Sequence, residues 1–187
     1  MAPAEETLAY FREGDVFTHC FHGRGHTIIG ADGHVLPCVW AARERGVIFC
    51  CANGTSRFSF STAEAAIADG FLPDVISTDN GRKSLYKRPQ QTRSFSLPYT
   101  MSKYLMLGME LNDVIRCVTE NPAKIVGHPE LGCLSIGTPG DVTITRIINK
   151  EVDFVDSEGE VRRGTKLLKP EMTICSGVCT FRQIDFF

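Results

Sequence analysis

Residues 46–79 read GVIFCCANGTSRFSFSTAEAAIADGFLPDVISTD, and this stretch decides the fold class. An unbroken apolar run at 47–53 is followed by an alanine-rich segment at 59–70, which a serine or threonine cap and a closing glycine mark as a helix. A second segment expected to be a strand, DVISTD, ends the stretch at 74–79. Apolar runs without alternation are typical of parallel strands that helices cover on both faces. The stretch therefore predicts a β–α–β unit of an α/β protein.

The same alternation extends outward from this stretch in both directions. Before it we expect a helix at 4–12, a strand at 15–20 (DVFTHC), a polar excursion at 22–36 and a helix at 37–46. After it we expect a polar, basic surface loop at 80–96 and helices at 98–109 and 112–127, the last one broken or kinked by Pro122.

The pattern changes from Leu131 onward. Short alternating segments at 141–147, 151–161 and 171–181 are separated by turn residues and predict a small β appendage. We therefore divide the chain into an α/β part, residues 1–130, and a C-terminal β segment, residues 131–187.

Composition limits the function classes. The chain has 187 residues, 43% of them hydrophobic, and a formal net charge of −2, which argues against nucleic acid or an anionic membrane as the main partner. No apolar run approaches the roughly 20 residues that span a bilayer. The N-terminal residues lack the apolar core of a signal peptide, so we expect a cytoplasmic protein with its eight cysteines as thiols.

Three polar residues stand at the ends of expected parallel strands: His19, Asn53 and Asp79. Reactive groups collect at these ends in parallel α/β folds. Imidazole and carboxylate are good ligands for a divalent metal, and a carboxylate there can also take a proton from metal-bound water. The alternatives are that His19 merely closes a buried strand and that Asp79 caps a helix or anchors a loop.

Four stretches make the sequence recognisable: GDVFTHCFHG (14–23), residues 46–79, PYTMSKYLMLGMELNDVIRCVTENPAKIVG (98–127) and LGCLSIGTPGDVTI (131–144). Together they resemble the last part of metal-dependent amidohydrolases, in particular the dihydroorotase-like deacetylase group. The resemblance covers nearly the whole chain.

The resemblance implies a partial (β/α) TIM-type barrel, in which 15–20, 47–53 and 74–79 are strands 6, 7 and 8, followed by the C-terminal part of a composite β-sandwich. It implies that His19 binds the metal, taken as one or two zinc ions, and that Asp79 is both a metal ligand and the general base and acid. Substrates would be small molecules with amide, cyclic amide or acyl ester bonds.

Two departures from the family pattern matter. The strand-7 histidine is replaced by Asn53, which with Gly54 is expected to contact substrate rather than metal, because an amide is a poor zinc ligand. The histidines of strands 1 and 5 and the lysine of strand 4 have no counterpart in the chain, which leaves an incomplete active site.

Two interpretations therefore stay open. In the first, the chain is a hydrolase whose site is completed by a missing N-terminal half or by a homo-oligomer. In the second, it is a non-catalytic truncated remnant or an interaction module that associates through an exposed sheet edge.

The remaining candidates have ordinary interpretations. The other loop histidines are expected to be solvated, His128 to be structural, and three cysteines next to the strand ends to lie in the core. These residues are His22, His26 and His34, and Cys20, Cys50 and Cys51.

Overall fold

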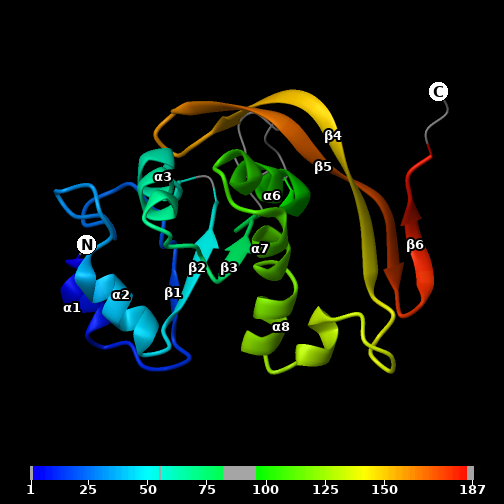
Figure 1. The fold of residues 1–187 in the computed structure, drawn as a ribbon, viewed down its shortest axis with the longest axis horizontal. Coiled ribbons are helices and arrows are strands. Elements are labelled where there is room, and N and C mark those ends of the chain that lie inside the picture. The colour runs from blue at the N-terminus through cyan, green and yellow to red at the C-terminus, as the bar shows by residue number, and fades with distance from the viewer. Residues whose placement is uncertain (1, 55, 82–95, 185–187) are drawn as a thin grey trace.

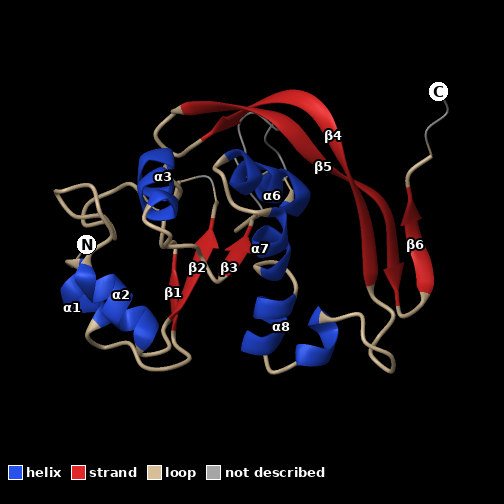
Figure 2. Cartoon of the chain, viewed as in Figure 1, coloured by secondary structure: helices blue, strands red, loops and turns tan. Residues whose placement is uncertain are grey.

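The computed structural model describes residues 2–54, 56–81 and 96–184. Within these residues no helix is long and apolar enough to cross a membrane. Helices and strands alternate up to β3, and long strands dominate after α8 (Figure 2). The elements are α1 Ala4–Leu8, β1 Val16–Thr18, α2 Pro37–Glu44, β2 Ile48–Ala52, α3 Phe60–Ala68, β3 Val75–Ser77, α6 Leu97–Met106, α7 Leu111–Arg116, α8 Glu120–Ile125, the 3-10 turn Pro129–Gly132, β4 Val142–Val155, β5 Val161–Cys175 and β6 Val178–Arg182.

The first three strands form a parallel sheet in the order β1-β2-β3. Thr18 pairs with Cys50, and Ala52 pairs with Ser77, so all three strands end at the same edge. The predicted α/β class is confirmed. Within the described residues the three strands form an open sheet and do not close into a barrel.

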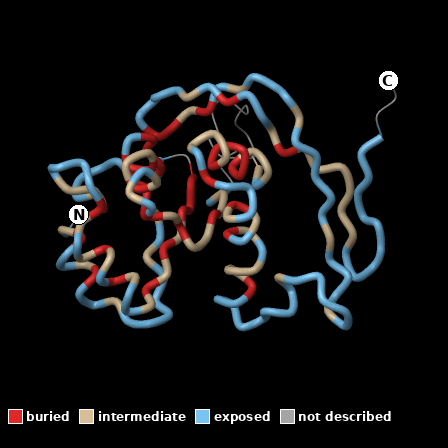
Figure 3. Tube along the Cα trace, in the orientation of Figure 1, coloured by how far each residue is buried: buried red, intermediate tan, exposed pale blue. Residues whose placement is uncertain are grey.

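Phe49 lies at the centre of the hydrophobic core. It is fully buried in β2, and its ring is 5.7 Å from that of Phe17 in β1 and 5.0 Å from that of Phe71 after α3. Figure 3 shows burial concentrated along β2 and in α6, whereas the chain around β6 is exposed. The centre of the parallel sheet is thus buried in the core, and the ends of its strands lie at one edge.

The last three strands form a separate antiparallel sheet in the order β4-β5-β6. β4 and β5 make a long bent ribbon that arches over α3 and α6 and descends beyond α7 and α8 (Figure 1). Hydrogen bonds from β5 attach the ribbon to α3 and α6. Arg162 of β5 donates to both carboxylate oxygens of Glu64 in α3, at 2.7 and 3.1 Å, and the Leu168 amide donates to the Ser102 hydroxyl of α6 at 2.9 Å.

Among the helices, α1 departs most clearly from its predicted boundaries. α1 ends at Leu8 rather than residue 12, because the amides of Tyr10 and Phe11 bond three residues back and tighten the chain into a turn. The helix expected at 112–127 is broken, as predicted, into α7 and α8. Pro122 lies in the first turn of α8, where its missing N–H has no cost. Residues 82–95 of the predicted basic loop lie outside the described residues.

Ser96 caps α6, and its removal has a small, measurable effect. Its hydroxyl accepts a hydrogen bond from the Tyr99 amide at 3.3 Å. We expect Ser96→Ala to lower the free energy of unfolding by about 1 kcal/mol, the usual cost of losing such a cap. Urea unfolding checks this, with Ser96→Asp as the matched control that keeps a side-chain acceptor. Equal losses in both variants would contradict the assignment of the cap.

Candidate active site

The parallel register brings the ends of the three strands together. His19 follows β1, Asn53 and Gly54 follow β2, and Asp79 lies two residues beyond β3. The Asn53 amide donates to the Ser77 carbonyl at 3.1 Å and the Gly54 amide to the Thr78 carbonyl at 2.9 Å. The predicted site residues therefore share the carboxyl edge of one sheet, where reactive groups of such folds collect.

The imidazole of His19 has a fixed tautomer. Its Nδ1 lies 2.7 Å from the carbonyl oxygen of Ala52, at the end of the neighbouring strand. Because a carbonyl only accepts hydrogen bonds, Nδ1 must carry the proton in this contact, which leaves the lone pair on Nε2. The ring is half-buried. Histidines that bind metals are commonly oriented by such a bond from the nitrogen that does not bind.

Asp79 and its neighbour Gly54 adopt left-handed backbone conformations. Their φ angles are +50° and +54°, and His19 is a third such residue at +62°. For non-glycine residues this region is uncommon and costs conformational energy, which is often stored at functional sites. A β-carbon on Gly54 would lie 2.5 Å from the Asp79 Oδ2, so the glycine leaves room for the carboxylate.

Gly54→Ala is expected to displace the Asp79 carboxylate and to lower the free energy of unfolding by about 2–3 kcal/mol. Part of this cost, about 1 kcal/mol, comes from placing alanine at positive φ, and the rest from the clash with Asp79. Gly70→Ala is the matched control, because Gly70 also has a positive φ of +80° but no atom within 4 Å of the added β-carbon. Chemical unfolding of both variants separates the two causes. Equal losses would show that Asp79 does not pack on Gly54.

The Asn53 side chain lies in the interior. It is fully buried, and its amide nitrogen donates to the carbonyls of Cys51 and Ser77 at 3.0 and 2.9 Å. Its oxygen accepts from the Tyr104 hydroxyl of α6 at 3.4 Å. Contact between Asn53 and substrate stays a prediction, and it requires the amide to exchange one of these partners. In the observed arrangement Asn53 ties β2, β3 and α6 together.

The cysteines around the strand ends are free thiols. Cys20 and Cys51 are buried as predicted, with their sulfur atoms 3.1 Å apart, and burial raises the pKa of Cys20 well above its usual value. Cys50 was also predicted to lie in the core, but it is only half-buried, because its side chain points to the other face beside the Ser77 hydroxyl. A thiol with a raised pKa is a poor nucleophile at neutral pH.

His22 corrects one prediction. It was expected to be solvated in a polar loop, but only 5% of it is exposed, and Nδ1 has no hydrogen-bond partner among the residues that the structure describes. Burial lowers its pKa. Its carbonyl accepts from the Thr62 hydroxyl of α3 at 3.2 Å, a contact between residues 40 apart that local sequence does not reveal.

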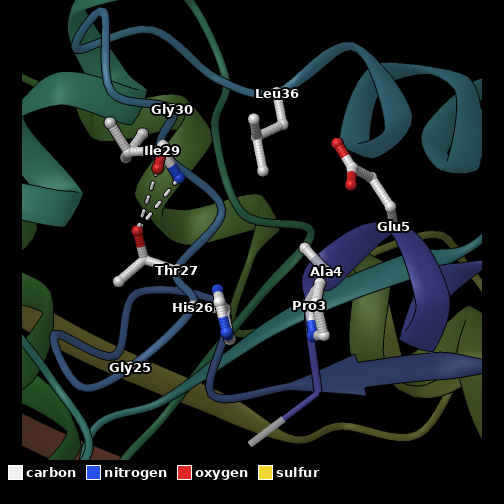
Figure 4. Close-up of a pocket in the computed structure, with 9 residues that line it drawn as sticks. All are labelled: Pro3, Ala4, Glu5, Gly25, His26, Thr27, Ile29, Gly30 and Leu36. Atoms are coloured by element: carbon white, nitrogen blue, oxygen red, sulfur yellow. Dashed lines mark hydrogen bonds between the residues drawn. The ribbon is translucent and has the colours of Figure 1, made fainter.

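The other histidines lie away from the strand ends. His26 lines a cavity of about 280 Å³ with Glu5 and Thr27, and no strand-end residue lines that cavity (Figure 4). His34 is exposed and lies 2.8 Å from the Asp69 carboxylate, which raises the pKa of the imidazole. His128 is exposed beside Glu130. None of the three joins the site.

The described residues supply two metal donors of suitable type at this edge, His19 and Asp79. Among residues 2–54, 56–81 and 96–184, no three histidine, cysteine, aspartate or glutamate side chains gather into a group that could hold a metal ion. The free Nε2 of His19 fits a metal, but tight catalytic sites use three or more protein ligands. The edge therefore fits part of a metal site.

Sequence reasoning missed two buried charged residues beneath the site, Lys103 and Asp156, each about 1% exposed. Asp156 accepts the Phe60 amide at 2.9 Å, so it caps α3 in place of the predicted serine or threonine. The available signal was a lysine inside the apolar run MSKYLM and an aspartate in a DSEG turn.

Comparison with known proteins agrees with this arrangement. The Amidohydrolase family model matches residues 7–178. A deacetylase of Brucella anthropi is 34% identical over 91% of this chain, which spans 41% of that protein. A crystal structure of an adenine deaminase superposes with a TM-score of 0.89 at 32% identity, and one of a dihydroorotase with 0.79 at 31%. These superpositions cover 97% and 100% of this chain and 48% of each of the other two.

The chain thus spans somewhat under half the length of these relatives, and the match runs through the sheet, its helices and most of the antiparallel ribbon. Amidohydrolases and dihydroorotases are typically metal-dependent, which agrees with a histidine and an aspartate at the strand ends. By its sequence and its fold, the chain belongs to the amidohydrolase family.

Proposed function

We propose that this chain carries part of the active site of a zinc-dependent hydrolase that cleaves amide, cyclic amide or acyl ester bonds of small molecules. The observation that carries the proposal is the bond from His19 Nδ1 to the Ala52 carbonyl, which leaves Nε2 as a donor on the edge that also presents Asp79. The three parallel strands are, in this proposal, strands 6–8 of a (β/α) barrel. Residues 131–187 belong to its β-sandwich domain.

His19 and Asp79 would hold the metal. A bound divalent ion lowers the pKa of its water and polarises the scissile carbonyl. Asp79 accepts the proton of the attacking water and delivers it to the leaving nitrogen or oxygen, the role of a general base and then acid. Its left-handed backbone and the missing side chain at Gly54 fix the carboxylate at the edge. In this proposal Asn53 and Gly54 contact the substrate.

Further donors must complete this site. We propose that they come from polypeptide corresponding to the unmatched part of the relatives, or from a second copy of the chain, since the relatives are about twice as long. Reduced thiols throughout the chain support the proposed cytoplasmic location.

Hydrolysis of an N-acetyl amino acid, a cyclic amide and an acetyl ester in the presence of zinc tests the proposal. We expect zinc-dependent turnover that Asp79→Asn lowers at least about 100-fold, in line with loss of a general base. Asp113→Asn is the matched control, because Asp113 lies on α7 and pairs only with Arg116 among the described residues. Rates equal to the uncatalysed background for all three substrates, with and without zinc, would overturn it if they were found both for the chain alone and for the chain joined to the unmatched part of a full-length relative.

A specific observation also favours the second candidate function, an interaction module. β1 is an edge of the parallel sheet, and Val16 on it is 39% exposed. An open parallel edge invites pairing with another chain. Sedimentation of the zinc-free protein tests this candidate: we expect a dimer that Val16→Pro dissociates, whereas a monomer at all concentrations would contradict it.

A further inference from the structure

Lys103 is a buried amine in the middle of α6. The residue is 1% exposed, and its Nζ lies 3.5 Å from the centroid of the Phe58 ring. Burial lowers its pKa to about 7, and the nearby Cys51 and Asp156 act in the opposite direction. An apolar side chain of the same length would avoid the cost of burying an amine. Unlike an apolar side chain, the protonated amine is attracted to the face of the Phe58 ring.

Phe58 is the anchor of the segment that joins β2 to α3. Its carbonyl accepts from the Ser157 amide at 2.9 Å, and the next residue, Ser59, donates to the Phe21 carbonyl at 2.8 Å. Its ring meets those of Phe60 and Tyr104 edge-on, at 5.4 and 6.0 Å. The far end of this segment is therefore fixed by the β4–β5 turn, the β1 loop and α6.

Tyr104, the next residue of α6, holds the near end of the same segment. Its hydroxyl donates to Asn53 Oδ1 at 3.4 Å, and Asn53 in turn donates to the carbonyls of Cys51 in β2 and Ser77 in β3. Two consecutive residues of one helix thus contact both ends of 53–58. Between these ends lies Gly54, on which the Asp79 carboxylate packs.

We propose that Lys103 and Tyr104 are positioning residues that hold Phe58 and Asn53, on either side of the position at which Gly54 supports Asp79. The inference deepens the proposed function, because it assigns to α6 the support of the proposed base. Lys103 does not contact the reacting atoms. It acts through Phe58, as Tyr104 acts through Asn53. The described titratable groups facing Lys103 are Cys51 of β2, Asp156 of the β4–β5 turn and Tyr104 of α6.

The test uses nuclear magnetic resonance of the zinc-free protein, so it does not depend on catalysis. In the wild type we expect the Lys103 ¹³Cε signal and the Gly54 amide signal to titrate with a common midpoint near neutral pH. In Lys103→Met the Gly54 amide signal should no longer shift with pH at the midpoint of Lys103. Hydrogen exchange of the Asn53 and Gly54 amides with solvent should become about tenfold faster. Methionine fills the space of the lysine stem, so this variant is expected to fold.

Two further variants make the result specific. Tyr104→Phe removes the hydrogen bonds of the hydroxyl to Asn53 and Cys51 but leaves the contact between Lys103 and Phe58 in place. It should accelerate exchange at Asn53 without changing the Lys103 midpoint. Lys124→Met is the control, because Lys124 is an exposed lysine of α8 paired with Glu120, and it should change neither signal. If Lys103→Met leaves the Gly54 titration and exchange unchanged, Lys103 is not a positioning residue. Failure of the hydrolysis assay alone would overturn the proposed function and leave this result standing.

Discussion

Asp156→Ala is expected to lower the free energy of unfolding by about 3–5 kcal/mol. The Asp156 carboxylate is buried and accepts three backbone amides, those of Phe60, Glu158 and Glu160, each at 2.9 Å. Hydrogen bonds to a charged acceptor contribute about 1.5–3 kcal/mol each, and a buried donor left without a partner costs further free energy. The Glu158 and Glu160 amides lie in an exposed turn, where water can replace the carboxylate. We therefore expect a loss smaller than the sum of the contributions of the three hydrogen bonds.

Urea unfolding followed by circular dichroism measures this loss, with Asp153→Ala as the matched control. Asp153 is exposed on the same hairpin and pairs with Arg163, so its removal should cost at most about 1 kcal/mol. The bond from the Phe60 amide joins the β4–β5 turn to the start of α3, and so the variant should also loosen the segment that carries Gly54. Similar losses of stability in both variants would show that Asp156 does not hold the β4–β5 turn against the start of α3.

Lys103→Met is expected to raise the free energy of unfolding by about 3 kcal/mol at pH 7 and less at pH 9. In the unfolded chain lysine has a pKa near 10.4, whereas burial lowers the pKa of Lys103 to about 7. Between these values the unfolded state binds a proton that the folded state does not, so stability falls by about 1.4 kcal/mol for each pH unit below about 10. Contact of the cation with Phe58 offsets up to about 2 kcal/mol of the total.

The prediction is checked by urea unfolding of the wild type and the variant at pH 7, 8 and 9. Subtracting one protein from the other removes the contribution of the cysteines, whose ionisation in the unfolded chain also varies over this range. The stability gained by Lys103→Met should grow as the pH falls from 9 to 7. A gain that does not change with pH would mean that Lys103 keeps the same charge in both states.

Much of the parallel sheet could be predicted from sequence because its signal is local. Buried strands such as 47–53 are almost entirely apolar, and glycines mark the ends of helices. The order and type of these elements could therefore be predicted. The antiparallel ribbon was harder. The charged residues around Lys150 separate two apparent short strands, yet β4 continues through them, because a register shift between Asn149 and Val152 accommodates the interruption.

For the candidate site, too, local features could be predicted and tertiary contacts could not. That His19 and Asp79 stand at strand ends is a local property, and the sequence reveals it. The bond from His19 to Ala52 and the packing of Asp79 on Gly54 depend on the register between strands, which no single strand encodes. Burial of His22 depends on its packing against α3, a contact between residues 40 apart that the local sequence does not reveal. For Lys103 the apolar neighbours in MSKYLM indicate burial, but the contact with Phe58 depends on the tertiary fold.

The central claim is that His19 and Asp79 are ligands of one divalent metal, and a calorimetric zinc titration tests it most directly. The purified chain should be compared with His19→Ala, Asp79→Asn and the control His128→Ala, whose exposed imidazole pairs with Glu130. We predict one binding event per chain that both site substitutions weaken at least tenfold and that His128→Ala leaves unchanged. Binding of the same strength and stoichiometry in all four proteins would place the zinc elsewhere, for example on surface thiols, and would contradict the account.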